Sequence, residues 1–175
     1  MMAVSALILV NSCGNNSKKV TENKKDSKTV FQEEDGTISL DLAKADCYNN
    51  MVDPSGNTAE WNVVVSKSGR YNVWLSSVTK DTTDLSYKNN VLISVQEIRL
   101  EKHPGCDKII HNTDEVSYPY FRADSFMGSM YIQDTGVFSF QVISEKIMPK
   151  DLNSNDLSGV DLSKLISVSF TPITR

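Results

Sequence analysis

The sequence predicts an all-β protein, folded as an antiparallel two-sheet β-sandwich of the jelly-roll type. Three observations lead to this fold class. Short segments of alternating apolar and polar residues recur along the chain, as half-buried strands require. Asn, Asp, Gly, Ser or Pro bound most of these segments, and these residues favour turns. No stretch has the periodicity of a long amphipathic helix, so parallel strands joined by crossover helices are not expected.

Length and charge restrict the class of protein further. The 175 residues fit one domain with a short appendage, and a hydrophobic fraction of 39% suits a globular chain. The net charge of -4 argues against a nucleic-acid partner, and no basic stripe with interleaved aromatics occurs in the sequence.

Residues 1–13 form a short apolar run that ends in Ser12-Cys13. The run is too short to span a bilayer as a helix, so it predicts a secretory signal. Val10-Asn11-Ser12-Cys13 resembles a bacterial lipobox, which implies that Cys13 carries a lipid and is the only contact with the membrane. Asn11 and the lack of a preceding Lys or Arg depart from that pattern. The alternative is a buried N-terminal strand with an incidental cysteine.

Residues 14–36 are polar, with lysines in the first half and acids in the second. Such a tract buries too little apolar surface to offset the entropy of ordering it. We therefore expect a flexible linker, which either rests its lysines on anionic headgroups or acts only as a solubilising tail. The folded domain is then expected at residues 37–175.

The candidate strands of that domain are short and evenly spread. They are residues 37–42, the two arms of 59–79, and residues 91–95, 97–100, 108–110, 127–132, 137–143 and 165–171.

Residues 59–79 predict a β-hairpin around which the sheets are organised. Both arms alternate, and Ser68-Gly69 supplies a turn residue that tolerates positive φ. The residues expected to face the core are Trp61, Val63, Val65, Tyr71, Val73, Leu75 and Ser77.

A second hairpin is expected at residues 131–138. Its turn, Asp134-Thr135-Gly136, has the letters of an aspartic-protease triplet, but that chemistry needs two carboxylates sharing a proton, and no second copy exists. A turn is therefore the prediction. In the final strand, Ile166, Val168 and Phe170 are expected to point inward.

The segments AEWNVVVSKSGRYNVWLSS and LISVSFTP together resemble the galactose-binding-like carbohydrate-binding modules. The shared features are a Trp-led strand, a Gly followed by Tyr-x-Val, and a closing apolar strand. The resemblance covers only these segments. It implies a β-sandwich, a glycan as ligand and, in many members, a structural calcium ion.

Two places in the sequence suit sugar recognition. Residues 118–124 bring aromatic, guanidinium and carboxylate groups into one extended segment, and Trp74 lies on the polar side of its strand. Aromatic faces pack on sugar C–H surfaces while polar groups bind the hydroxyls. The alternatives are an ordinary edge strand and packing under a loop. The candidate ligand-binding residues are Trp74, Tyr118, Tyr120, Arg122 and Asp124.

Oxygen donors occur at alternate positions, Asp151, Asn153 and Asn155, and Asp156 follows them, a pattern like the start of a calcium loop. Asp156 occupies the place of the required Gly, however, so a solvated loop is the alternative. No cofactor other than this structural calcium is expected.

The remaining cysteines, Cys47 and Cys106, form an even pair if Cys13 is lipidated, and export would permit a disulfide between them. His103 and His111 flank Cys106, but their spacing matches no compact metal site. No nucleophile motif or phosphate loop occurs.

Together these features predict an exported lipoprotein without enzymatic activity, which is anchored at the bacterial cell envelope, periplasmic or surface-facing, and binds glycan. The alternative is an envelope scaffold that contacts protein and no sugar.

Overall fold

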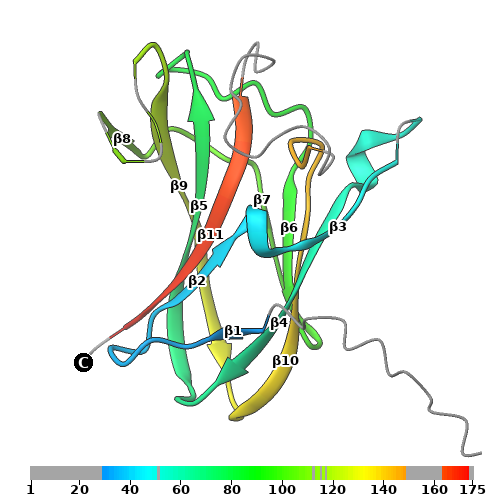
Figure 1. The fold of residues 1–175 in the computed structure, drawn as a ribbon, viewed down its shortest axis with the longest axis vertical. Coiled ribbons are helices and arrows are strands. Elements are labelled where there is room, and N and C mark those ends of the chain that lie inside the picture. Colours follow the sequence, from blue (N-terminus) through cyan, green and yellow to red (C-terminus); the bar gives the residue numbers. More distant parts are fainter. Residues whose placement is uncertain are drawn as a thin grey trace, which may run out of the picture.

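The computed structural model describes residues 29–50, 52–111, 113–114, 116, 118–148 and 163–173. Over these residues the protein is a sandwich of two β-sheets (Figure 1), which confirms the predicted fold class. The helical elements among them are two short 3₁₀ turns, η1 (Leu42–Lys44) and η2 (Pro54–Gly56). Within this part of the chain, no helix has the length and apolar character needed to cross a bilayer.

The first sheet has six strands in the order β1-β4-β10-β6-β7, and β3 also pairs with β4. All pairs are antiparallel except β1 with β4. Its strands are β1 (Val30–Phe31), β3 (Asp46–Tyr48), β4 (Thr58–Val65), β6 (Val91–Val95), β7 (Ile98–Lys102) and β10 (Gly136–Ile143).

The second sheet has five strands in the order β2-β11-β5-β9-β8, all antiparallel. In Figure 1 the long strands β5, β9 and β11 lie side by side as one layer against β4, β6 and β10. The strands are β2 (Ile38–Asp41), β5 (Gly69–Thr79), β8 (Lys108–Ile110), β9 (Phe121–Ile132) and β11 (Ser163–Pro172).

The core lies between the sheets and contains aromatic side chains from both. Phe140 of β10 meets Phe170 of β11 edge-on, with ring centroids 5.1 Å apart. Trp61 and Tyr71 are each 1% exposed and Val73 is fully buried, as the alternating pattern predicted. The indole Nε1 of Trp61 donates a hydrogen bond of 2.9 Å to the carbonyl of Asp41, so its one polar group is satisfied inside the core.

The predicted hairpin at residues 59–79 is wrong in its pairing. β4 pairs with β10 in the first sheet, whereas β5 pairs with β11 and β9 in the second. The turn at residues 66–68 therefore crosses from one sheet to the other. The alternation shows that both arms bury one face. The same pattern of apolar and polar residues arises whether the two arms pair in one sheet or face each other across the core.

The second predicted hairpin, residues 131–138, has the same error. Asp134-Thr135 do lie in a turn, as predicted, but β9 and β10 belong to opposite sheets. The hairpin that does form joins β6 to β7, with Gln96 at φ 55 in the tight turn.

The final strand follows the prediction at Val168 and Phe170, which are fully buried. Ile166 is only half-buried, because an irregularity between Leu165 and Ser167 shifts the register and places Leu165 in the core instead.

The flexible linker predicted through residue 36 ends earlier than expected. Val30 pairs with Val63 in β1, and Gly36 is buried. The side chain of Gln32 accepts hydrogen bonds from the backbone N–H of Ser66 (2.9 Å) and of Lys67 (2.7 Å). Residues 29–36 thus belong to the sandwich and hold the turn between β4 and β5, whereas residues 1–28, with Cys13, lie outside the described part.

Replacing Gln32 by Ala should lower the free energy of unfolding by about 1 to 2 kcal/mol, because it removes several hydrogen bonds of modest individual value. Besides the turn, the Gln32 amide also donates to the carbonyl of Gly36 (2.6 Å) and to the hydroxyl of Tyr71 (2.8 Å). Urea denaturation measures the loss, with exposed Gln133→Ala as control. Equal stability of both variants would place residues 29–36 in the linker after all.

The predicted disulfide is also absent, because Cys47 and Cys106 are both thiols. Cys47 lies in β3, which pairs with β4 near the β1 edge of the first sheet. Cys106 precedes β8, the strand at the opposite edge of the second sheet. The two cysteines therefore lie on opposite sides of the sandwich, and no bridge can join such positions without backbone movement.

Candidate functional site

The outer face of the second sheet carries an aromatic pair at its centre. Trp74 of β5 lies directly opposite Phe126 of β9 in the strand register, and their ring centroids are 5.1 Å apart at a tilt of 53°. Both side chains are half-exposed. The prediction that Trp74 faces outward is therefore confirmed, and its partner Phe126 is a residue that we did not expect.

A β-bulge in β9 brings a third aromatic residue, Tyr131, onto this face. Phe126 pairs with Trp74, but Gly128 pairs with Val73, so Met127 is an extra residue. Met127 is buried, and beyond it the alternation has changed phase. Tyr131 is consequently 54% exposed and lies five positions from Phe126 on the same outer side. We call Trp74, Phe126 and Tyr131 the aromatic face.

Gly128 makes the bulge possible. Its φ of 142° is a conformation that side-chain-bearing residues rarely adopt. A Cβ built there would lie 2.9 Å from Cδ1 of Leu100 in β7. An isolated glycine in a strand pattern is the one signal from which the bulge, and hence Phe126 and Tyr131, could have been found in the sequence.

Strand β7 borders the aromatic face, although it belongs to the other sheet. β8 pairs with β9 only at residues 122–124. Along the rest of this edge of β9, the neighbouring strand is β7. The ammonium of Lys102 donates to the carbonyl of Phe126 at 2.6 Å and lies 5.6 Å from the centroid of its ring. With Leu100 against Gly128, β7 follows β9 from the centre of the face toward its end.

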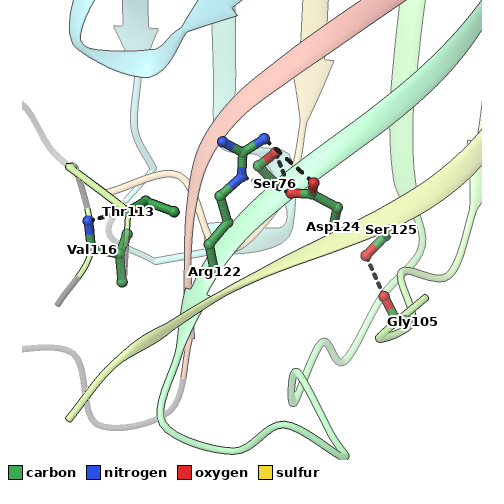
Figure 2. Close-up of polar contacts among 7 residues, drawn as sticks. All are labelled: Ser76, Gly105, Thr113, Val116, Arg122, Asp124 and Ser125. Atoms are coloured by element: carbon green, nitrogen blue, oxygen red, sulfur yellow. Dashed lines mark hydrogen bonds and ion pairs between the residues drawn. The ribbon is translucent and has the colours of Figure 1, made fainter. Parts of the chain in front are cut away.

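Arg122, Asp124 and Ser76 form a polar cluster on the same sheet (Figure 2). Arg122 Nε donates to Asp124 Oδ1 at 2.8 Å, and Ser76 Oγ donates to the same oxygen at 2.8 Å. The Asp124 side chain is only 11% exposed, against 28% for Arg122. Charge-assisted bonds thus compensate the burial of Asp124, and its oxygens are committed within the protein.

The part of this face that holds the cluster is covered. Val78 lies opposite Arg122, yet it is 1% exposed. Val116, in the segment between β8 and β9, is 2% exposed. Neither residue belongs to the core between the sheets. Among the predicted residues, Arg122 and Asp124 therefore lie beside Trp74 on one sheet face but are less accessible than the aromatic face.

Tyr118 and Tyr120 lie in the segment that leads into β9. Tyr118 is 81% exposed. Tyr120 is half-buried, and the ammonium of Lys80 lies 5.1 Å from the centroid of its ring, within the range of a cation–π contact. The structure therefore places these two tyrosines just before β9. The Arg122 cluster separates them from the aromatic face.

Polar groups at the same end of the sandwich hold the loop between β5 and β6. The hydroxyl of Tyr87 lies 2.9 Å from that of Ser77, and burial raises the pKa of the Tyr87 phenol. Glu145 Oε1 accepts hydrogen bonds from the backbone N–H of Lys88 (2.6 Å) and Asn89 (3.2 Å). These contacts fix the loop and have a structural role.

The described residues contain no group of three or more His, Cys, Asp or Glu side chains placed to hold a metal ion. Both histidines are exposed, and His111 packs edge-on against Phe121. Burial, with a smaller effect of nearby acids, raises the pKa of the Cys106 thiol, the opposite of what activates a nucleophile. The candidate calcium ligands Asp151, Asn153, Asn155 and Asp156 lie outside the described residues.

Comparison with known proteins gives a fold and no family. No family model and no curated protein matches the sequence. Among solved structures, a region of alpha-L-fucosidase from Vibrio sp. strain EJY3 is similar over 83% of this chain and 24% of its own, with 21% identity and a TM-score of 0.64. A Podospora anserina GH26-CBM35 beta-(1,4)-mannanase matches over 81% of this chain and 28% of its own, with 9% identity and a TM-score of 0.45.

The chain thus spans about a quarter of the length of these structures. The similarity to the fucosidase region shows a shared β-sandwich fold and nothing of the ligand, so the site itself has to be argued from its side chains.

Proposed function

We propose that this protein is a non-catalytic glycan-binding module whose ligand lies along the aromatic face. The observation that carries the proposal is the arrangement of Trp74, Phe126 and Tyr131 on the outer side of neighbouring strands, away from the core. Between the rings, Ser129 Oγ donates to Asn72 Oδ1 at 2.8 Å, so hydroxyl and amide groups lie among them.

This combination suits a sugar better than an apolar partner. Ring faces pack against the C–H surfaces of a sugar, while the hydroxyl and amide groups between them exchange hydrogen bonds with its hydroxyls. A rigid sheet also holds the rings in place before binding, which lowers the entropic cost of association. Lys102 above the Phe126 ring further restricts the movement of that side chain.

The other predicted residues have secondary places in the proposal. Arg122 is held by Asp124, and its side chain, 28% exposed, borders the face, where its guanidinium can donate to a sugar oxygen. Asp124 acts as the positioning residue for Arg122. Tyr118 and Tyr120 would extend the contact only for a ligand long enough to pass the covered part of the sheet.

A screen of the full chain carrying Cys13→Ser against immobilised neutral and acidic glycans tests the proposal. We expect at least one polysaccharide class to be retained, and expect Phe126→Ala to weaken retention without unfolding the protein. Failure to retain any glycan would contradict the proposal.

The opposite sheet favours the alternative, a protein-interaction module. Phe31, Val64 and Val137 are opposite one another in neighbouring strands of the first sheet, and Phe31 and Val137 are 68% and 67% exposed. An apolar stripe of this kind suits contact with another protein. If the glycan screen is negative, this surface is the one to test with Phe31→Ser.

We further propose that Cys13 anchors the module in a bacterial envelope membrane. The apolar run that ends at Ser12-Cys13, with a polar tract after it, supports this placement. Metabolic labelling with an alkyne fatty acid should tag the wild-type protein and not Cys13→Ala. Equal labelling of the two, or labelling of neither, would remove the anchor from the account.

A further inference from the structure

An open depression of about 620 Å³ lies at the end of the aromatic face, remote from Arg122. It is formed by the β6–β7 turn, the end of β9 and the turn that follows. Its lining residues are Gln96, Glu97, Ile98, Tyr131, Gln133 and Asp134.

The lining has unused hydrogen-bonding capacity. Within the described part of the chain, no side-chain hydrogen bond or ion pair involves Glu97, Asp134 or the two glutamines. Carboxylates accept hydrogen bonds and carboxamides both donate and accept. The polar groups of the lining are therefore mostly acceptors, and the Tyr131 ring and Ile98 form its apolar wall.

The depression is continuous with the aromatic face. Tyr131 belongs to both, and β7 borders both, with Lys102 at Phe126, Leu100 at Gly128 and Ile98 at the depression. A chain of sugars lying along β9 over Phe126 would consequently reach the depression with its next units.

We propose that this depression is a subsite for one further sugar unit and that it favours a neutral or positively charged unit over a uronate. The inference rests on the proposed glycan function of the aromatic face. Hydroxyl groups of the sugar would donate to Glu97 and Asp134, and its C–H surface would pack on Tyr131. A uronate at the same place would bring a third carboxylate beside two others, and this repulsion would weaken its binding.

A metal ion is a poorer occupant. The described residues provide no cluster of three potential ligands here, and the two carboxylates come from separate turns with amides between them.

The test uses the full chain carrying Cys13→Ser and a panel of cello-, manno- and xylo-oligosaccharides of two to six units, with oligogalacturonates of the same lengths. We expect affinity for the neutral series that binds to rise with length until the depression is filled. Tyr131→Ala should abolish this last gain and weaken the longest oligosaccharide about three- to tenfold.

The charge preference is tested with Glu97→Gln/Asp134→Asn, which keeps acceptors but removes both charges. This variant should bind oligogalacturonate about two- to fivefold more tightly than the parent at low salt. Glu101→Gln, a carboxylate at the other end of β7, is the matched control and should change nothing.

The possible failures are distinguishable. If Trp74→Ala weakens binding but affinity is independent of length and of both Tyr131 and the two acids, the subsite is disproved and the glycan function stands. If no oligosaccharide or polysaccharide binds, the glycan function fails and the subsite with it.

Discussion

Replacing Trp61 by Ala is expected to lower the free energy of unfolding by about 3 to 5 kcal/mol, the range for truncating a buried aromatic residue. Trp61 is 1% exposed, and its removal opens a cavity between the sheets that the surrounding side chains can fill only in part. The carbonyl of Asp41 also loses the indole donor at 2.9 Å. Chemical denaturation followed by circular dichroism measures the effect.

Trp74→Ala is the matched control, since it removes the same side chain from the outer face of the sandwich. Because Trp74 is half-exposed and packs chiefly on Phe126, we expect a much smaller loss, about 1 kcal/mol. A loss at Trp74 as large as that at Trp61 would mean that Trp74 is a core residue.

Gly128→Ala should destabilise the protein by about 1 to 3 kcal/mol, the cost of holding a side-chain-bearing residue in a rarely populated conformation. The φ of 142° strains any substituent, and the new Cβ also meets Leu100 at 2.9 Å. Since Gly128 fixes the phase between Phe126 and Tyr131, any rearrangement of the bulge would also disturb the aromatic face. Thermal unfolding gives the stability change.

Gly105→Ala provides the comparison, because a Cβ at Gly105 would meet nothing within 4 Å. Its effect should stay within about 0.5 kcal/mol. Equal tolerance of Ala at both glycines would show that the bulge does not need glycine.

Alternation identified most of the residues that face the core, because burial of one face is a local property of a strand; it failed at Ile166, where the register shifts. It could not identify partners. Trp61 and Tyr71 were correctly placed inside, yet their strands belong to opposite sheets, and a short turn permits either arrangement. The order of strands depends on contacts between residues far apart in the sequence, which periodicity does not contain.

The predicted N-terminal boundary of the folded domain, residue 37, was wrong for a similar reason. Residues 29–36 are polar, and composition averaged over residues 14–36 predicted a linker. Order there comes instead from the pairing of β1 with β4 and from the hydrogen bonds of Gln32 to a turn more than 30 residues away.

The site was predicted in part. Trp74 was found because it interrupts the polar side of an alternating strand. Phe126 and Tyr131 were not found, since strict alternation puts an even and an odd position on opposite faces, and only the extra residue at Met127 unites them. Arg122 and Asp124 were predicted as ligand-binding groups, and the structure shows that they form an ion pair with each other.

The most direct test of the account is a calorimetric titration with the oligosaccharide that the panel selects, comparing the parent chain, Trp74→Ala and Tyr48→Ala. Tyr48 is an exposed aromatic residue of the first sheet, 59% accessible, and it controls for loss of any surface ring. We expect Trp74→Ala to weaken binding by about 1 to 3 kcal/mol, as for an aromatic hot spot, while Tyr48→Ala binds like the parent. Unchanged affinity of Trp74→Ala, or an equal loss in both variants, would contradict it.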